Sequence, residues 1–216
     1  MQRLSSREPM PAELRGAVIA LGNFDGFHLG HQAVAARALD MAQALGAPAI
    51  IATFDPHPVR HLKPDAPPFR LTSLDQRERL FADAGAAAML VLEFDDALAG
   101  TSAEDFVDQL LVNRFGAAGI VTGCDFTFGR GRGGSVATLE AAAAAGKFAY
   151  AAVDPVVDAV GPISSSRIRD VLGAGDCAAA ARLLTRPFAI EGVVQHGDKL
   201  GRTIGFPTAN LELDRY

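Results

Sequence analysis

Short, continuous apolar runs alternate with longer amphipathic stretches along most of this chain. The apolar runs lie at residues 18–21, 49–54, 88–92, 119–123 and 148–153, and stretches with helical spacing lie at residues 30–45, 74–84, 102–115 and 136–145. The runs are apolar throughout rather than at every second residue, which is typical of parallel strands covered by helices on both faces. This pattern predicts a doubly wound α/β domain, an architecture whose ligands bind beyond the carboxyl ends of the strands.

The character of the sequence changes after about Leu184. Residues 188–197 predict a strand, a glycine-punctuated loop follows, and residues 208–213 predict the start of another strand. Two strands cannot bury a core or close a barrel. We therefore expect one domain over residues 1–184 and only the beginning of a β-rich domain over residues 185–216.

Composition argues against several classes of function. The net charge of −5 and the isoelectric point near 5.5 argue against a protein that holds nucleic acid through bulk electrostatics. No apolar run approaches the roughly 18 residues that span a bilayer, the first 16 residues contain no signal-peptide core, and the two cysteines lack zinc-site spacing. We therefore expect a cytoplasmic protein without a nucleic-acid or membrane partner, and the oligomeric state is left open.

The first predicted strand leads directly into a glycine-rich loop, residues 22–31, with the sequence GNFDGFHLGH. Its three glycines let backbone approach a ligand and expose N–H groups where the next helix begins. His28 and His31 are three residues apart, so their imidazoles fall on nearly the same face of that helix start. Donors in this position can hold phosphate oxygens and stabilise the charge that builds on them.

Five segments together resemble one protein family. The His-x-Gly-His of residues 28–31 is similar to the signature of the nucleotidyltransferase superfamily. Residues 53–58 (TFDPHP), 123–129 (GCDFTFG), 163–169 (ISSSRIR) and 201–210 (GRTIGFPTAN) resemble motifs of prokaryotic FAD synthetases, which are bifunctional riboflavin kinase/FMN adenylyltransferases. The resemblance implies a Rossmann-like nucleotidyltransferase domain over residues 1–184, followed by the truncated start of a β-barrel riboflavin kinase domain over residues 185–216.

The resemblance also implies a reaction. FMN would attack the α-phosphorus of ATP in line, pyrophosphate would leave, and FAD would be the product, with Mg²⁺ as the cofactor. Such a reaction proceeds by positioning and charge stabilisation and needs no covalent enzyme intermediate. A longer parent chain would also phosphorylate riboflavin to FMN, and we expect that second activity to be absent from the chain as it stands.

The family's functional residues carry over to matching positions here. The catalytic residues implied are His28, His31, Ser164 and Arg169. The residues implied to bind ATP are Gly22, Asn23, Phe24, Asp25, His28, Gly30, His31, Ser164, Ser165, Ser166 and Arg167. Those implied to bind the flavin are Phe54, Pro56, His57, Pro58, Asp125, Phe126 and Phe128, and Thr208 and Asn210 would help to hold magnesium in an intact kinase domain.

Other interpretations stay open at this point. The serine run can be a simple helix cap, the phenylalanines can pack between strand and helix, and residues 186–216 can be an inert tail. The chain could also be a same-fold nucleotidyltransferase with another phosphorylated acceptor, such as phosphopantetheine or nicotinamide mononucleotide, or a non-catalytic nucleotide- or flavin-binding fragment. The TFDPHP and PTAN segments favour the flavin enzyme, and the two histidines with the serine run argue against a pure binder.

Overall fold

A six-stranded parallel sheet forms the centre of the computed structural model, which describes residues 1–63, 65, 70–198 and 200–211. The strands are β1 (Gln2–Ser5), β2 (Val18–Leu21), β3 (Ala49–Asp55), β4 (Ala88–Glu93), β5 (Gly119–Gly123) and β6 (Ala149–Val153), in the spatial order β1-β4-β3-β2-β5-β6. All five neighbouring pairs are parallel. The doubly wound α/β prediction is confirmed.

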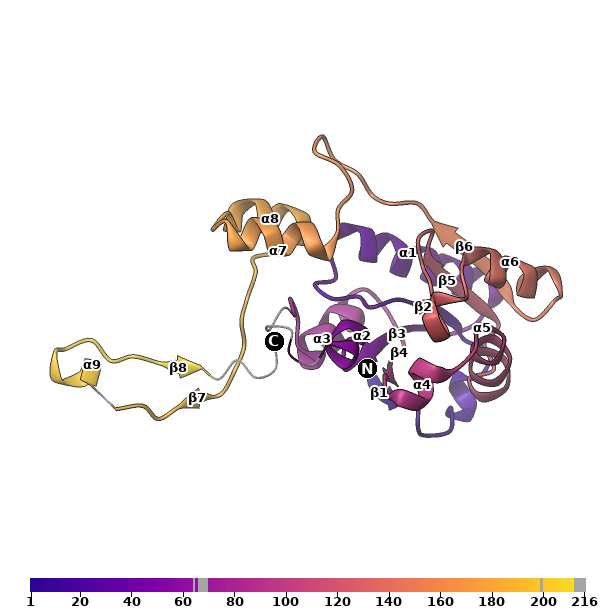
Figure 1. Cartoon of the computed structure of the whole chain (residues 1–216), viewed down its shortest axis with the longest axis horizontal. Helices are drawn as coiled ribbons and strands as arrows, with labels where there is room; N and C mark the ends of the chain where they lie inside the picture. The colour runs from indigo at the N-terminus through magenta and orange to yellow at the C-terminus, as the bar shows by residue number, and fades with distance from the viewer. Residues whose placement is uncertain (64, 66–69, 199, 212–216) are drawn as a thin grey trace.

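Helices cover both faces of this sheet (Figure 1). The larger ones are α1 (Leu29–Leu45), α3 (Leu74–Asp83), α5 (Ala103–Asp105) continuing as a π-helix (Phe106–Arg114), α6 (Val136–Ala144), α7 (Ser165–Gly173) and α8 (Cys177–Leu184). Shorter helical segments are α2 (Pro58–Leu62), α4 (Asp96–Gly100), α9 (Leu200–Thr203) and the 3-10 turns Ala12–Leu14 and Arg130–Arg132. Within the described ranges, none of the helices is long and apolar enough to cross a membrane.

The two faces of the sheet explain why its central strands are apolar at nearly every position. Val18 and Ala20 of β2 pack with α1 and α3, whereas Ile19 and Leu21 pack with the 103–115 helix and α6. Successive side chains of a strand point to opposite faces, so a strand buried on both sides needs an apolar residue at every position. The continuous runs of the sequence are therefore a direct consequence of the layered architecture.

The strand order places the glycine-rich loop at a special point of the sheet. β2 pairs with β3 on one side and with β5 on the other, so the connection that follows β2 leads to β3 on one side and the connection that follows β5 leads to β6 on the opposite side. Such a switch point leaves a crevice in which open α/β sheets bind their ligands. The loop after Leu21 begins at this point.

The structure differs from the sequence-based expectation at both ends. The edge strand β1 was not predicted because the segment QRLS lacks an apolar run. The strand expected over residues 188–197 is only β7 (Val194–Gln195), which pairs antiparallel with β8 (Asn210–Leu211). Val193 and Val194 are 71% and 61% exposed, so no core holds the rest of that segment in a sheet. Of the second expected strand, residues 212 and 213 lie outside the described residues.

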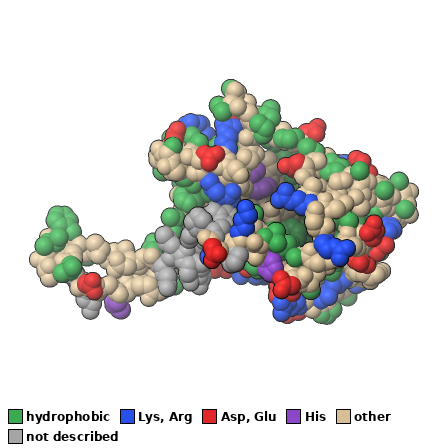
Figure 2. All heavy atoms as spheres, viewed as in Figure 1, with side chains coloured by type: hydrophobic (Ala, Val, Ile, Leu, Met, Phe, Trp, Pro, Cys, Tyr) green, Lys and Arg blue, Asp and Glu red, His purple; other side chains and the backbone are tan. Residues whose placement is uncertain are grey.

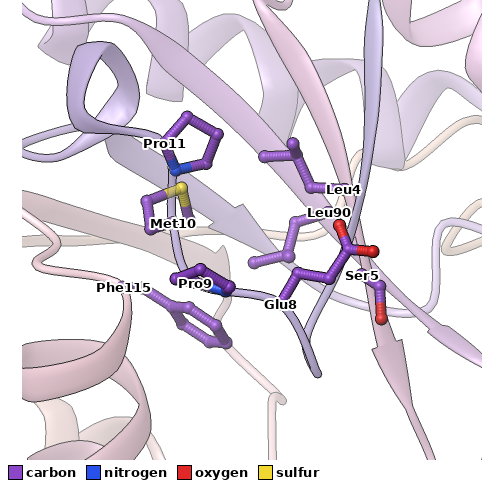
Figure 3. A pocket seen from close by; sticks show the side chains of 8 residues that line it. All are labelled: Leu4, Ser5, Glu8, Pro9, Met10, Pro11, Leu90 and Phe115. Atoms are coloured by element: carbon purple, nitrogen blue, oxygen red, sulfur yellow. The ribbon is translucent and has the colours of Figure 1, made fainter.

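A small cavity lies between the N-terminal segment and the sheet (Figure 3). It encloses about 30 Å³ and is lined by Leu4, Met10, Pro11, Leu90 and Phe115, among others. A volume of this size holds a water molecule or two and no nucleotide. None of the predicted site residues lines it. This cavity is therefore not a nucleotide site, whereas the switch point brings the predicted site residues together.

Candidate active site

Two histidines lie face to face where α1 begins. The ring centroids of His28 and His31 are 3.7 Å apart and the rings are inclined by only 21°. His28 caps the helix, because its Nδ1 accepts a hydrogen bond of 3.4 Å from the His31 N–H. A neutral His28 therefore carries its proton on Nε2, and this N–H group can donate a hydrogen bond to a ligand oxygen. The predicted pair is thus brought together at the helix start.

Both imidazoles are neutral near pH 7. Burial is the main cause that lowers the pKa of His28 to about 4 and holds the pKa of His31 well below its ordinary value. The nearby charge of Arg169 lowers both pKa values further. Within the described part of the chain, Nδ1 of His31 is buried without a hydrogen-bond partner. The pair therefore offers directional hydrogen-bonding groups rather than positive charge.

Two glycines around the pair leave little room for a side chain. A Cβ atom on Gly30 would lie 3.2 Å from the His28 ring and 3.4 Å from the Ile163 carbonyl oxygen. A Cβ atom on Gly22 would lie 3.3 Å from the ring of Phe24. Both glycines therefore keep the loop, the imidazole and the approach to α7 in close contact.

The loop itself contains two strained residues. Phe24 and Phe27 have φ angles of 49° and 41°, which bulky residues rarely adopt. Both rings are buried against Phe81 of α3, and Phe24 also meets the ring of His31 at 5.2 Å. Backbone strain persists only where surrounding contacts hold it. Phe24, expected to bind ATP, is thus placed behind the histidine pair.

Asp25 connects the loop to three other segments. Its carboxylate, which is 1% exposed, accepts hydrogen bonds from the Leu71 and Thr72 N–H groups at 3.0 and 3.1 Å. It also accepts from Arg77 of α3 at 3.1 Å and from Arg169 of α7 at 2.6 Å. Burial alone would raise the pKa of Asp25, but the charges of Arg77 and Arg169 and the Leu71 hydrogen bond outweigh it and lower the pKa. Asp25 is therefore the ionised centre that fixes the loop.

Arg77 is a residue of this site that sequence reasoning missed. It is completely buried and donates to Thr53 Oγ1 of β3 at 3.0 Å, besides its contact with Asp25. Thr53 in turn donates to the Asn23 carbonyl oxygen at 2.6 Å. In the sequence, Arg77 stands next to Gln76 and Glu78 in a helix, where it resembles an ordinary surface charge. No local signal could have distinguished it.

The start of α7 faces the loop through only some of its predicted residues. Ser165 Oγ donates to the Asp25 carbonyl oxygen at 2.8 Å, and Arg169 reaches the Asp25 carboxylate. Ser164 caps the helix by accepting from the Arg167 N–H, whereas Ser166 is exposed. The Arg167 guanidinium turns to Asp158 at 2.7 Å and to the Gly161 carbonyl. The structure thus unites Ser165 and Arg169 with the loop and directs the side chain of Arg167 elsewhere.

The loops after β3 and β5 contain both core and surface residues. Phe54 and Phe128 are buried in the main core, against Phe94 and Phe106 respectively, as the packing alternative expected. Phe126 is only partly buried and stacks on Phe128 with centroids 5.7 Å apart.

Four further residues predicted to bind the flavin belong to the same two loops. Pro56 and Asp125 are exposed, and Pro58 is the first residue of α2. His57 is buried and caps α2, and burial lowers its pKa to about 4.

The kinase-site magnesium prediction concerns the C-terminal hairpin. Thr208 and Asn210 are both exposed, and Asn210 pairs with Gln195 across β7 and β8. Among the described residues, no group of three or more His, Cys, Asp or Glu side chains could hold a metal ion. The role of Thr208 and Asn210 therefore stays a prediction.

On the face shown in Figure 2, histidine and basic side chains gather around a hollow between the α7–α8 region and the body of the sheet domain. The hollow adjoins the segments that the contacts above connect. A lining that includes basic and histidine side chains suits a phosphorylated ligand.

Comparison with known proteins identifies the family to which the chain belongs. A family model for FAD synthetase matches residues 10–167, and a model for riboflavin kinase matches residues 184–216. Curated relatives named bifunctional riboflavin kinase/FMN adenylyltransferase include one from Pseudomonas fluorescens, 39% identical over 100% of this chain and 69% of the relative. The relative from Escherichia coli (strain K12) is 37% identical over 94% of this chain and 65% of its own length, and that from Bacillus subtilis (strain 168) is 39% identical over 92% and 62%.

A solved structure leads to the same fold. A crystal structure described as a macrolide-efflux protein from Streptococcus pneumoniae matches with a TM-score of 0.85 and 32% identity, over 100% of this chain and 70% of that one. The chain spans about two thirds of the length of the curated relatives that it matches. The match of the FAD synthetase model and the identities to these relatives show that this chain belongs to the FAD synthetase family.

Proposed function

We propose that this chain transfers AMP from Mg-ATP to FMN. A phosphate oxygen of FMN forms a bond to the α-phosphorus of ATP, the bond from that phosphorus to the bridging oxygen breaks, and pyrophosphate leaves with the electron pair. The product is FAD. The observation that carries the proposal is the stacked, neutral pair of His28 and His31 at the start of α1, beside Arg169 and at the switch point of the sheet.

The histidine pair is placed to stabilise the negative charge that develops on phosphate oxygens during the transfer. Because His28 Nδ1 accepts from the His31 N–H, the proton of the neutral imidazole on Nε2 is a donor for a phosphate oxygen. The first N–H groups of α1 add donors and a positive helix end at the same place. Donors fixed before the reaction stabilise the negative charge on the leaving pyrophosphate without reorganising. The serine run and Arg169 would contribute a second set of contacts from α7.

The other predicted ATP contacts divide into direct and supporting ones. Asn23 is exposed at the loop and Gly30 adjoins the His28 ring, so both are suited to line the nucleotide. Asp25 is buried and bound to two arginines, so it would act by holding the loop and Arg169 in place. Phe24 would likewise act through His31. These residues would position the groups that touch ATP.

The flavin would lie over the loops after β3 and β5. Phe126 offers a partly exposed ring, and Asp125 and Pro56 are exposed beside the carboxyl edge of the sheet. Phe54 and Phe128 would support this surface from the core. Flat apolar walls with a few polar groups are what an isoalloxazine ring requires.

Magnesium would enter together with ATP. Mg²⁺ prefers phosphate oxygens and water, with one or two protein oxygens at most, so it does not need a cluster of carboxylates. Thr208 and Asn210 would serve only a second, kinase-site magnesium in an intact kinase domain. The use of ATP also favours a cytoplasmic location, and the expected partners are the small molecules ATP and FMN.

A chromatographic assay tests the proposal. The purified chain is incubated with Mg-ATP and one of three acceptors: FMN, nicotinamide mononucleotide or phosphopantetheine. We expect FAD and pyrophosphate in equal amounts from FMN, and no adenylylated product from the other two. A His28→Ala variant serves as the control for contaminating activity. Adenylylation of another acceptor but not of FMN would refute the flavin assignment, and ATP binding without any product would favour the non-catalytic alternative.

A further inference from the structure

The segment that follows α8 is attached to the glycine-rich loop. Arg186 donates from Nη2 to the Gly26 carbonyl oxygen at 2.7 Å and from Nη1 to the Phe27 carbonyl oxygen at 3.4 Å. A further bond of 3.0 Å joins Nη1 to the Leu184 carbonyl of its own turn. One guanidinium thus spans two consecutive carbonyls directly ahead of His28.

Further contacts hold the same segment in place. Gln32 of α1 donates from its amide to the Phe27 carbonyl at 3.0 Å and to Thr185 Oγ1 at 2.9 Å. Thr185 adopts a left-handed φ of 62°, which turns the chain out of α8 toward the loop. The Phe27 carbonyl therefore accepts hydrogen bonds from two side chains, Gln32 of α1 and Arg186 of the segment after α8.

The segment is also tied to α3. Gln76 donates from its amide to the Ala189 carbonyl at 2.9 Å, and Arg79 forms an ion pair with Glu191. In Figure 1 the chain leaves the α7–α8 pair and runs along the side of the domain toward β7. Among the described residues, Glu191 is the last one in this segment whose side chain contacts the sheet domain, and the described hairpin residues beyond it are nearly all exposed.

These contacts fix the backbone in front of the catalytic histidine. A trans peptide is planar, so its carbonyl and its N–H point in opposite directions. Holding the Gly26 and Phe27 carbonyls therefore fixes the directions of the Phe27 and His28 N–H groups as well. The Phe27 residue between them has strained backbone angles, and strain of that kind needs outside contacts to persist.

The positive charge of Arg186 lies beside this loop and has no ion-pair partner among the described residues. No carboxylate lies within ion-pair distance of its guanidinium in the part of the chain that the structure describes. The side chain is partly buried, and its positive charge acts on His28. A cation that bonds only to carbonyls supplies geometry and a positive field at the same place.

We infer that residues 185–191 form an element that positions the glycine-rich loop for AMP transfer, chiefly through Arg186. The riboflavin kinase model matches residues 184–216, so this element lies within the segment that resembles the other activity. The functional unit for AMP transfer therefore extends to about Glu191 rather than to Leu184. The kinetic part of this inference rests on the proposed function, whereas the effect on the loop does not.

Three variants of the full chain test the inference. Arg186→Ala removes the contacts, Arg186→Lys keeps the charge but cannot span both carbonyls, and Arg182→Ala removes an exposed arginine from α8 as the matched control. Hydrogen exchange is followed for peptides that cover residues 24–32, where the Gly26 N–H donates to Thr72 Oγ1 and the Phe27 N–H to the Phe24 carbonyl. Steady-state kinetics with FMN and Mg-ATP are measured in parallel.

We expect Arg186→Ala to speed exchange in residues 24–32 about tenfold and to lower kcat/KM about tenfold, mainly through kcat. Arg186→Lys should recover part of both effects, and Arg182→Ala should match the wild type. Equal loop exchange in the two alanine variants would overturn the inference, as would faster exchange throughout the sheet, which would indicate a general loss of stability. Absence of FAD formation by the wild type would instead refute the proposed function, and the exchange comparison would still decide the contact.

Discussion

Replacing the buried carboxylate of Asp25 at the centre of the site should lower the free energy of unfolding of the protein substantially. In Asp25→Asn the side chain keeps its shape but loses its charge, while Arg77 and Arg169 keep theirs. The remaining partners of Arg77, such as the oxygens of Thr53 and Thr72, are neutral and cannot balance a buried guanidinium. Removing one partner of a buried ion pair costs about 3–5 kcal/mol, chiefly because the other charge is left uncompensated.

The structure indicates which arginine accounts for most of this cost. The side chain of Arg77 is 1% exposed and that of Arg169 is 27% exposed. Water can therefore replace Asp25 beside Arg169 but not beside Arg77. We expect Asp25→Asn to lower the free energy of unfolding by about 3 kcal/mol or more at pH 7. Adding Arg77→Met should restore part of the loss, because no buried charge then stays unpaired.

The pH dependence gives this prediction a second test. The pKa of Asp25 is lowered in the folded state, so its stabilisation is present above the ordinary value of 3.8 and is lost as the pH falls below it. The difference between wild type and Asp25→Asn should therefore shrink in acid.

Urea denaturation followed by circular dichroism measures both effects, with Asp158→Asn as the control that disrupts an exposed ion pair. A loss in Asp25→Asn no larger than that in Asp158→Asn would refute the reasoning.

Three further predictions follow from the site. His28→Ala should lower kcat about 10²–10³-fold with little change in the KM for ATP, because its donor acts mainly on charge that develops in the transition state; steady-state kinetics decide this. The pKa values of His28 and His57 are about 4 in the folded state, below the unfolded value of 6.5. The free energy of unfolding should therefore fall by about 2 kcal/mol for each histidine between pH 7 and pH 5. His57→Gln should remove the contribution of His57, as measured by urea titrations at both pH values. The 216-residue polypeptide should form no FMN from riboflavin and ATP, since its hairpin beyond Glu191 is nearly all exposed; a radiolabelled phosphate assay checks this.

Sequence patterns predicted the elements whose signal is local. The four central strands of the sheet are buried on both faces, so each of them appears in the sequence as a nearly continuous apolar run, as in residues 49–54. The histidine pair was likewise recognisable in the sequence, because both residues follow a glycine-rich turn at the start of a predicted helix. The edge strand Gln2–Ser5 has no such run, since it is bounded by solvent on one side and its residues are exposed or only partly buried.

The supporting residues of the site could not be predicted in the same way. Arg77 and Arg186 are ordinary arginines in the sequence, and each acquires its role only when distant segments meet. Arg77 lies 52 residues from Asp25 along the chain, and Arg186 lies 160 residues from Gly26. No spacing rule for one helix or loop contains such a contact. The side chains predicted to touch a ligand form a local sequence pattern, whereas the contacts of those that hold the loop form only in the tertiary fold.

The charges around the histidine pair reconcile an acidic protein with a polyphosphate substrate. The chain carries a net charge of −5, yet the carboxylate and guanidinium groups whose charges act most on the two imidazoles are Asp25 and the arginines at positions 77, 169 and 186. One carboxylate among three guanidinium groups leaves two positive charges in excess at the loop. The imidazoles stay neutral because burial and these same arginines lower their pKa values. In the proposed reaction, fixed arginine charge would therefore attract ATP, and both neutral histidines would act as hydrogen-bonding groups toward its phosphates.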